Sequence, residues 1–367
     1  MNSLLIAIRN LFGEKGRLII TVSGVAFSVT LILVLLGLYQ GWNLQMTKFL
    51  GNIPVDYWVG QKGSRDVSHS VSILSSDLKS KISQVDGISE VNTFVGKQVS
   101  FKKNNQEVRI FLVGLEKYGV TKPFKIESGN EFPNKNEIIL DQTIARREDI
   151  KIGDKLSINS EELTVSGISS GGNLMIYSYA FVNMEDAKKI IDFKSFVNYY
   201  LIKSDNMDLT KENLEKAFPN LEIMSKQQFL DNNTEIITDT FLPIIEVLLI
   251  IAVVIGIAVI GLTIYTATIE KSQEYGVLKA IGYSNLQLFS IALIQSLVAG
   301  IIGLIAGSIL TILVVNLATY VTSAFIFELG FPEMMAVISM ALGMSIVAAF
   351  IPLRRLLSID PANVFKV

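Results

Sequence analysis

Four long apolar stretches stand out along the chain. Each of them is long enough for the roughly 20 helical residues that cross a hydrocarbon layer of about 30 Å. The first stretch contains no charged residue, and the second contains only Glu246, near its start. The pattern predicts an α-helical membrane protein with four transmembrane helices, at 18–38, 242–264, 287–314 and 334–352.

The first two spans are separated by a long segment, 39–241, with a different pattern. Short runs of alternating apolar and polar residues predict strands, and runs with helical spacing predict helices. We therefore expect an α+β domain here, ending in a helical stalk, with an inserted subdomain at about 119–195. The expected strands are 98–101, 108–113, 137–140, 156–158, 163–168 and 199–203, and the expected helices are 75–84, 183–191, with Asn183 as its N-cap, and 209–217. The strand–helix–strand pattern at 199–224 would return to the first subdomain, and Pro243 either starts the second span or kinks one continuous helix.

The distribution of Lys and Arg predicts the orientation in the membrane. Eight of the 32 basic residues lie in the leader 1–17, the loop 265–286 and the tail 353–367, whereas the loop 315–333 has none. Since cytoplasmic loops are enriched in Lys and Arg, both termini and the loop 265–286 are expected in the cytoplasm. The domain 39–241 is then exported. The first span reads as an uncleaved anchor after an amphipathic leader, because its apolar run exceeds the usual ~7–15 residues of a signal peptide.

Composition excludes several functions. The chain has a net charge of −2 and no cysteine, so it offers neither a basic surface for nucleic acid nor a thiolate site. Its single histidine, His69, excludes a histidine-rich zinc site, and we expect no metal site and no catalytic residue. No Gly-Lys-Ser/Thr triplet of a Walker A motif occurs, so the chain is not expected to hydrolyse ATP.

Small residues mark one face of the third span. Gly300, Gly303 and Gly307 are spaced so that a second helix can approach closely. The spacing fits packing within the chain and packing against a second copy equally well. Glu246 is read either as an interfacial residue or as a contact for substrate or a second copy.

The cytoplasmic loop contains the most informative segment, from Glu270 to Ser284. Glu270 and Glu274 are spaced i, i+4, and the apolar residues Val277, Leu278 and Ile281 form a face at helical spacing that we expect to lie opposite charges. Gly282 suits a helix C-cap, with Lys279 in the last turn. From these residues alone, a helix lying on lipid and a docking helix for a cytoplasmic partner are equally supported.

These residues resemble a known family. The segment Glu270–Ser284 is similar to the E-x-x-x-E-[IY]-G-[VIL]-L-[RK]-A-[IL]-G stretch of FtsX-like, MacB-type ABC transporter permeases. The tail Ile351-Pro-Leu-Arg-Arg-Leu-Leu-Ser-Ile-Asp-Pro361-Ala resembles the closing signature of that family, with Asn363 where an acid is usual. The segments 136–140, 153–156 and 165–168 resemble its exported domain, and the opening resembles the DevC-like branch.

The resemblance implies partners and residue roles. Such permeases pair with a second permease copy and sit in the lipid bilayer on a separate P-loop ABC ATPase that binds ATP and Mg; many members also use a membrane-fusion adaptor. The loop between the second and third spans would couple to the ATPase through Glu270, Glu274, Tyr275, Gly276, Lys279 and Gly282. Arg354, Arg355 and Pro361 would lie at the inner interface, although arginines there are also explained by membrane topology alone.

Three functional hypotheses follow. The first is an ABC permease subunit of a bacterial inner membrane that exports or extracts a hydrophobic, peptide or lipid-linked substrate by mechanotransmission. The second is an FtsX-like signalling device that activates an exported protein such as a cell-wall hydrolase. The third, an intramembrane enzyme, is disfavoured because the spans carry no paired carboxylates and no H-E-x-x-H motif.

Overall fold

The computed structural model describes residues 3–67, 70–103, 105–174, 177–321 and 325–357. The described chain forms two compact units. The helical unit contains Met1–Gly41, Phe241–Val321 and Phe327–Val367, and the α+β unit contains Trp42–Thr240 together with Phe325 and Ile326. Each unit is described by itself below.

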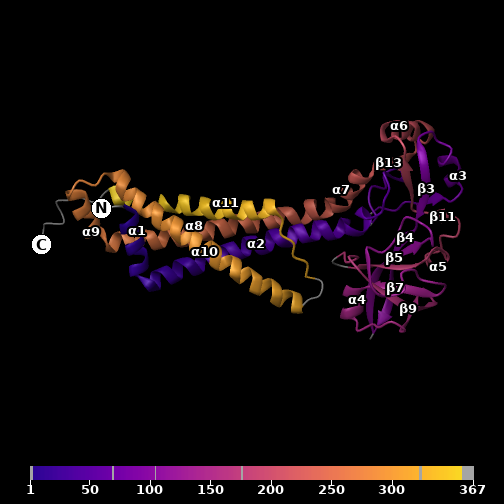
Figure 1. The fold of residues 1–367 in the computed structure, drawn as a ribbon, viewed down its shortest axis with the longest axis horizontal. Coiled ribbons are helices and arrows are strands. Elements are labelled where there is room, and N and C mark those ends of the chain that lie inside the picture. Colours follow the sequence, from indigo (N-terminus) through magenta and orange to yellow (C-terminus); the bar gives the residue numbers. More distant parts are fainter. Residues whose placement is uncertain (1–2, 68–69, 104, 175–176, 322–324, 358–367) are drawn as a thin grey trace. The chain divides into compact units, whose positions relative to one another are not determined.

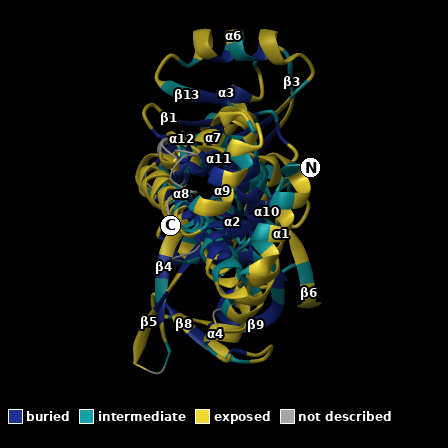
Figure 2. Ribbon diagram, turned by 90° about the vertical axis from the view of Figure 1, so that its left-hand side faces the viewer, coloured by how far each residue is buried: buried dark blue, intermediate teal, exposed yellow. Residues whose placement is uncertain are grey.

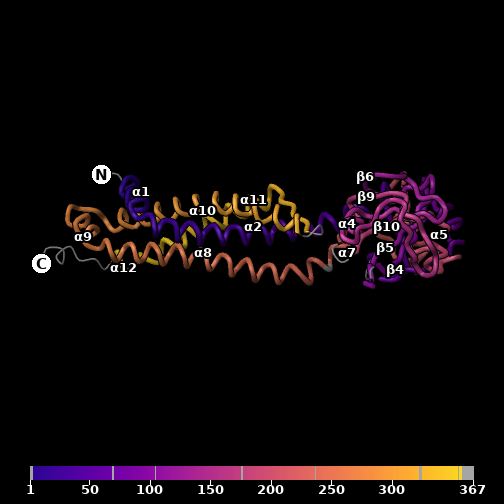
Figure 3. Tube along the Cα trace, turned by 90° about the horizontal axis from the view of Figure 1, so that it is seen from below, coloured from indigo at the N-terminus to yellow at the C-terminus, as the bar shows by residue number. Residues whose placement is uncertain are grey.

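Four helices in the described residues are long and apolar enough to cross a membrane. They are α2 (Lys15–Gly51), the helix that ends as α8 (Leu242–Glu270), α10 (Asn285–Val321) and α11 (Phe331–Ala349). This confirms the four predicted spans. The shorter α1 (Ser3–Gly13), α9 (Ser272–Ala280) and α12 (Leu353–Leu357) gather at one end of the unit (Figure 1 and Figure 3).

The leader forms α1, which packs beside α10 (Figure 3). Ala7 is fully buried in this contact, whereas Leu4, Leu5, Ile8 and Phe12 are exposed. An exposed apolar stripe on a short helix is typical of a helix that lies in a membrane interface.

The α+β unit contains a four-stranded antiparallel sheet. Its order is β13-β1-β12-β3, with β1 (Tyr57–Gln61) and β12 (Tyr199–Ser204) at the centre and β3 (Ile88–Phe94) and β13 (Leu221–Ser225) at the edges. The chain after residue 199 therefore returns to the sheet that residues 57–94 began, as the sequence predicts. A small pair, β2 (Leu74–Ser75) and β11 (Phe196–Val197), lies outside this sheet.

A second sheet has seven strands in the order β6-β9-β7-β10-β5-β4-β8. Because β8 also pairs with β9, six of these strands close into a ring, with β6 outside it. The strands are β4 (Gly96–Lys103), β5 (Gln106–Leu115), β6 (Lys125–Gly129), β7 (Glu137–Asp141), β8 (Lys155–Ile158), β9 (Glu161–Ser170) and β10 (Ser178–Asn183).

This sheet begins earlier than the subdomain expected at 119–195. The hairpin β4–β5 precedes residue 119 but pairs with β8 and, in parallel, with β10. The turn signals near 118–122 mark the exit from β5, not the start of a new sheet. Parallel pairs between distant segments leave no local signal in the sequence, which explains the difference.

Four of the short helices in this unit begin at side-chain caps. Asn183 accepts a hydrogen bond from the Asp186 amide at the start of α5 (Met184–Ile190), which confirms the predicted cap. Asp141, Asn206 and Ser225 act in the same way for the other three, which are α4 (Gln142–Arg147), α6 (Met207–Ala217) and α7 (Lys226–Ile236). The helix expected at 75–84 is limited to α3 (Leu78–Ile82).

Helical structure continues from Lys226 to Glu270 over 45 residues. A π-helical turn, Ile237–Phe241, joins α7 to α8, and Pro243 stands in the first turn of α8. Proline has no N–H and crowds the preceding turn, so it is favoured in the first turn of a helix. Of the two alternatives for Pro243, the structure supports the start of a span, and helical structure continues from α7 into α8.

Burial differs between the units. In the helical unit, buried positions lie along the inner faces of the helices and many outward positions are exposed (Figure 2). An outer surface this apolar is expected where lipid is the solvent. In the α+β unit one large cluster of buried residues joins both sheets.

Candidate functional site

Helix α9 forms a separate short element between α8 and α10. Lys271 ends α8 with its amide bonded to the Ala267 carbonyl, and α9 starts at the next residue. At the other end, Gly282 has a φ of +101°, and the Gly282 and Tyr283 amides bond back to Lys279 and Leu278. This pattern is a Schellman motif, and it confirms the helix stop predicted at Gly282.

The two faces of α9 differ sharply. Tyr275, 3% exposed, and Gly276 are buried against the rest of the helical unit. Glu274 is exposed, as are Val277 at 44% and Ile281 at 69%, so the apolar face expected opposite the charges is wrong at these positions because they share the helical face of Glu274. The predicted coupling residues therefore divide into an inward group and an outward group.

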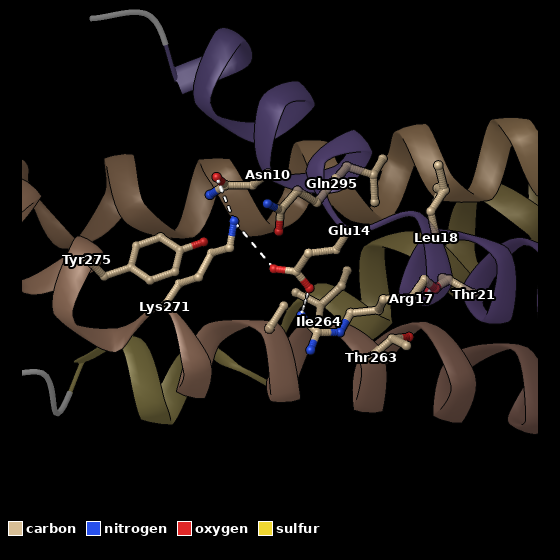
Figure 4. Close-up of a pocket in the computed structure, with 13 residues that line it drawn as sticks. Asn10, Glu14, Arg17, Leu18, Thr21, Thr263, Ile264, Lys271, Tyr275 and Gln295 are labelled. Carbon is tan, nitrogen blue, oxygen red and sulfur yellow. Dashed lines mark hydrogen bonds and ion pairs between the residues drawn. The ribbon is translucent and has the colours of Figure 1, made fainter.

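The inward face meets a set of polar residues that we call the elbow cluster (Figure 4). It lies where α1 turns into α2 and where α8 turns into α9. Its members are Asn10, Glu14, Arg17, Glu270, Lys271, Tyr275 and Gln295.

Ion pairs connect the two turns within this cluster. Arg17 Nη2 lies 2.7 Å from Glu270 Oε2, and Lys271 Nζ lies 3.4 Å from Glu14 Oε1. Arg17 also pairs with Glu14, and Lys271 donates a hydrogen bond to Asn10 Oδ1 at 3.1 Å. Figure 4 shows Glu14 between the two cations. Each turn thus holds one acid and one base that pair with the other turn.

Tyr275 inserts its ring at the buried edge of this cluster. Burial raises the pKa of the Tyr275 hydroxyl to about 12, and hydrogen bonding to Asn10 and Gln295 opposes that shift. The hollow around these groups has a volume of only about 30 Å³. Such a space suits about one water molecule and no larger ligand. The cluster therefore connects the two helix turns and does not form a ligand-binding pocket.

The tail meets the same end of the unit. Lys279 Nζ donates to the Leu357 carbonyl at 3.3 Å, which links α9 to α12. Leu356 is buried and Arg355 is exposed. Arg354 belongs to α12, while Pro361 lies outside the described residues, as does His69.

The glycine stripe of α10 is buried against helices of the same chain. A Cβ on Gly303 would lie 2.4 Å from Val25 Cγ1, and one on Gly307 would lie 2.8 Å from the Ala26 carbonyl oxygen. A Cβ on Gly300 would overlap the Ser345 side chain of α11. Of the two alternatives left open by the sequence, these contacts support packing within the chain.

Sequence reasoning did not assign Asn10, Glu14, Arg17, Lys271 or Gln295 to the site. Glu14 is the break between α1 and α2, and Arg17 lies in the first turn of α2, where charges interrupt two apolar runs. That position was the available signal, but the spacing of residues cannot show that they meet a loop more than 250 residues away. Among the described residues, no group of three or more acidic, histidine or cysteine side chains is placed to hold a metal ion.

Family models cover most of the chain. Residues 18–217 match the MacB-like periplasmic core domain, and residues 246–361 match the FtsX-like permease C-terminal region. The first match begins in the first turn of α2 and ends with α6, and the second begins in the first turns of α8 and continues through α9, α10, α11 and α12.

Individual relatives are similar over nearly the full length. A putative hemin transport system permease protein, HrtB, from Staphylococcus haemolyticus is 25% identical over 90% of each chain. An uncharacterized ABC transporter permease from Mycobacterium tuberculosis is 21% identical over 98% of each chain.

Solved structures match the exported part at low similarity. The periplasmic region of MacB from Actinobacillus actinomycetemcomitans is 13% identical, with a TM-score of 0.38, over 49% of this chain and 93% of that one. The extracellular domain of YknZ from Gram-positive bacteria is also 13% identical, with a TM-score of 0.37, over 46% and 99%. These TM-scores are below 0.5, so the assignment rests on the family models.

A MacB-like periplasmic core between the first and second spans makes the α+β unit an extracytoplasmic domain of a multi-pass membrane protein. The FtsX-like region supplies the remaining spans and the α9 segment. As the non-catalytic membrane subunit of a transporter whose ATPase is another subunit, this chain belongs to the FtsX-like, MacB-type ABC transporter permeases.

Proposed function

We propose that this permease transmits ATP-driven movement from its ATPase subunit to the extracytoplasmic domain. The observation that carries the proposal is the division of α9, which presents Glu274, Val277 and Ile281 outward and buries Tyr275 against the elbow cluster. Because one face of α9 is exposed and the other is packed against the helical unit, a partner that displaces α9 also displaces the helices that α9 contacts. Glu270 and Tyr275 hold α9, whereas Glu274 faces the ATPase.

The ion pairs of the elbow cluster connect α9 to both α2 and α8. Through Arg17–Glu270 and Lys271–Glu14, a displacement of α9 acts on the start of α2 as well as on the end of α8. Both helices continue along the chain into the extracytoplasmic domain. There, Phe49 at the end of α2 packs on Tyr179, with ring centroids 4.4 Å apart, and Phe229 of α7 stacks on Trp58 at 4.1 Å. Both stalk ends are therefore anchored in the core of the domain that moves.

The charge distribution supports the orientation. With the MacB-like domain outside, the end that carries α1, α9 and α12 is cytoplasmic, together with its eight Lys and Arg residues. Both termini then lie in the cytoplasm of a bacterium, at its inner membrane. The expectation that Arg354, Arg355 and Pro361 act near the ATPase or anionic headgroups is part of this proposal.

The remaining partners follow from the family. The ATPase supplies the sites for ATP and Mg, and a second permease copy completes the membrane part. Many exposed apolar residues on α8, such as Ile244, Val247 and Ile251, offer a face for that copy or for lipid. A membrane-fusion adaptor would bind the extracytoplasmic domain.

The substrate is hydrophobic, peptide or lipid-linked, and the similarity to a putative hemin permease adds hemin to the compounds for testing. The alternative is a signalling device that activates an exported protein, such as a cell-wall hydrolase. Substrate-stimulated ATP hydrolysis in liposomes supports transport. Binding of an exported protein without any movement of substrate supports signalling.

The test is Glu274→Lys in the complex with the ATPase. We expect normal membrane insertion and ATP hydrolysis, with loss of the coupled output, because the charge facing the ATPase is reversed. Glu107→Lys is the matched control, since it makes the same charge change on an exposed strand residue of the other unit. Unchanged output in Glu274→Lys, or equal loss in both variants, would contradict the proposal.

A further inference from the structure

A cavity lies at the opposite end of the helical unit from the elbow cluster. It has a volume of about 560 Å³ and is formed by the last half of α10 and the first half of α11, with Leu33 of α2 closing one side. These parts of α10 and α11 diverge in Figure 1. The cavity size falls in the range of roughly 300–1,000 Å³ that is typical of small-molecule sites.

The cavity is near the outer surface of the membrane. The Glu328 amide, next to the lining residues Phe327 and Leu329, bonds to the Gly37 carbonyl close to where α2 leaves for the extracytoplasmic domain. This level of the helical unit is therefore the outer leaflet.

The walls are apolar and open toward lipid. Ser308, Thr311 and Asn316 are the polar lining residues, and the first two already donate hydrogen bonds to carbonyls of their own helix. Ile305, Ile309 and Ile312 line the cavity and are more than half exposed. Water gains few hydrogen bonds in such a space, whereas a hydrocarbon chain can enter it sideways and fill it.

The rim is acidic. From residue 280 to residue 353 the only charged residues are Glu328 and Glu333, and both are chain neighbours of lining residues. Glu333 folds back over Gly330, and in the described structure its Oε2 is buried with no hydrogen-bond partner. Glu333 stands in the first turn of α11, where the helix dipole favours a negative charge, so its free oxygen is available to a cationic group at the edge of the cavity.

We propose that this cavity binds an amphiphile with a hydrocarbon chain and a cationic head, taken from the outer leaflet. The chain occupies the space between α10 and α11, and the head lies beside Glu333 and Glu328. This inference rests on the proposed transport function and names its substrate class.

The test uses the full complex in phosphatidylcholine vesicles that contain stearylamine with a photoreactive diazirine on its chain. We expect adducts, mapped by mass spectrometry, to concentrate on 304–316 and 334–338. Unlabelled stearylamine should compete at about fivefold lower concentration than stearic acid, the effect of one partly exposed ion pair. Glu333→Gln and Glu328→Gln should each reduce that preference without moving the adducts.

Two variants control for the cavity itself. Ile338→Trp fills the space and should remove the adducts, whereas Ile346→Trp places the same ring on an exposed part of α11 outside the cavity and should leave them. Adducts spread evenly over the lipid-facing helices, equal competition by stearic acid, or crosslinks between two copies at these residues would each overturn the proposal. If Glu274→Lys still uncouples the complex in that case, only the substrate class fails and the coupling function stands.

Discussion

The helical unit and the extracytoplasmic domain of this permease differ in the kind of side chain that packs inside each of them. In the helical unit, neighbouring helices approach closely at glycines, as at Gly24 against Val259 and Gly307 against Ala26 and Val29. In the extracytoplasmic domain, large aromatic residues pack together, with Trp58, Phe94, Tyr199 and Phe229 in one cluster.

The difference follows from the solvent. In water, burial of large apolar side chains drives folding, so aromatic clusters stabilise the domain as one body. In lipid this drive between helices is absent, and close approach at small residues takes its place. Under the proposed mechanism, helices that meet at small residues would shift without repacking large side chains, and the aromatic core would let the domain move as one body.

The largest expected effect is in the aromatic cluster. Trp58→Ala should cost the extracytoplasmic domain about 3–5 kcal/mol, since Trp58 is fully buried and contacts three rings. Hydrogen exchange of β1 and β12 in the full chain measures the loss. The helices α10 and α11 should keep their protection.

Two further variants sharpen this result. Trp58→Phe keeps a ring against Phe229 and removes a buried indole N–H that has no partner in the described structure, so it should cost clearly less. Tyr118→Ala, at a residue 92% exposed, should change nothing. Equal losses in all three would show that the cluster does not hold the domain.

The next effect is at the glycine face. Gly307→Ala should destabilise the helical unit by about 1–3 kcal/mol, because the new Cβ would lie 2.8 Å from the Ala26 carbonyl oxygen. Gly343→Ala is the matched control, since nothing lies within 4 Å of its Cβ position. Unfolding in mixed detergent micelles compares the two. A loss in Gly343→Ala as large as in Gly307→Ala would mean that contact distance is not the cause.

Sequence patterns predicted the elements better than their partners. Apolar length gave the four spans, alternation gave strands such as β5 and β12, and Asn183 and Gly282 marked helix ends, because each of these signals is local. The hairpin β4–β5 was placed outside the second sheet because its parallel pairing with β10 joins residues about 70 apart.

The site shows the same limit. The α9 segment was identified from its charges and its C-cap, but the sequence treated Glu270, Glu274 and Tyr275 as one group. Their division depends on which face of α9 meets Asn10, Glu14 and Arg17, and these residues come from the far end of the chain. Helical spacing shows which residues share a face, and tertiary contacts decide which face is covered.

A smaller effect is expected at Tyr275. Tyr275→Phe should weaken the packing of α9 by about 1 kcal/mol near neutral pH, the usual value of a buried hydrogen bond. The raised pKa of Tyr275, about 12, also predicts how the packing of α9 changes at alkaline pH. Below pH 10 the hydroxyl is protonated whether α9 is packed or open; between about 10 and 12 only the open form ionises readily, so packing weakens as the pH rises.

The measurement is the melting temperature of the solubilised protein on both sides of this interval. The parent chain should lose more stability than Tyr275→Phe, which has no hydroxyl to ionise. An identical alkaline loss in both would assign the effect to other groups, such as lysines that lose their charge.

The smallest effect on stability is expected at the ion pairs of the elbow cluster. We expect these pairs to matter for coupling because they connect α9 to α2, although each contributes little to the free energy of unfolding. Glu270→Arg alone should cost about 0.2–1 kcal/mol, since Glu270 is well exposed. Arg17→Glu should cost more, because it also removes the pair with Glu14, and the double reversal should recover only the part that comes from the Arg17–Glu270 pair. Coupled output should be lost in the single variants and partly recovered in the double one. The matched pair Lys155–Glu162 of the other unit, reversed in the same way, should leave output unchanged. If instead the single reversals leave output intact, α9 acts through α8 alone, and the charges at the start of α2 serve only to position the leader.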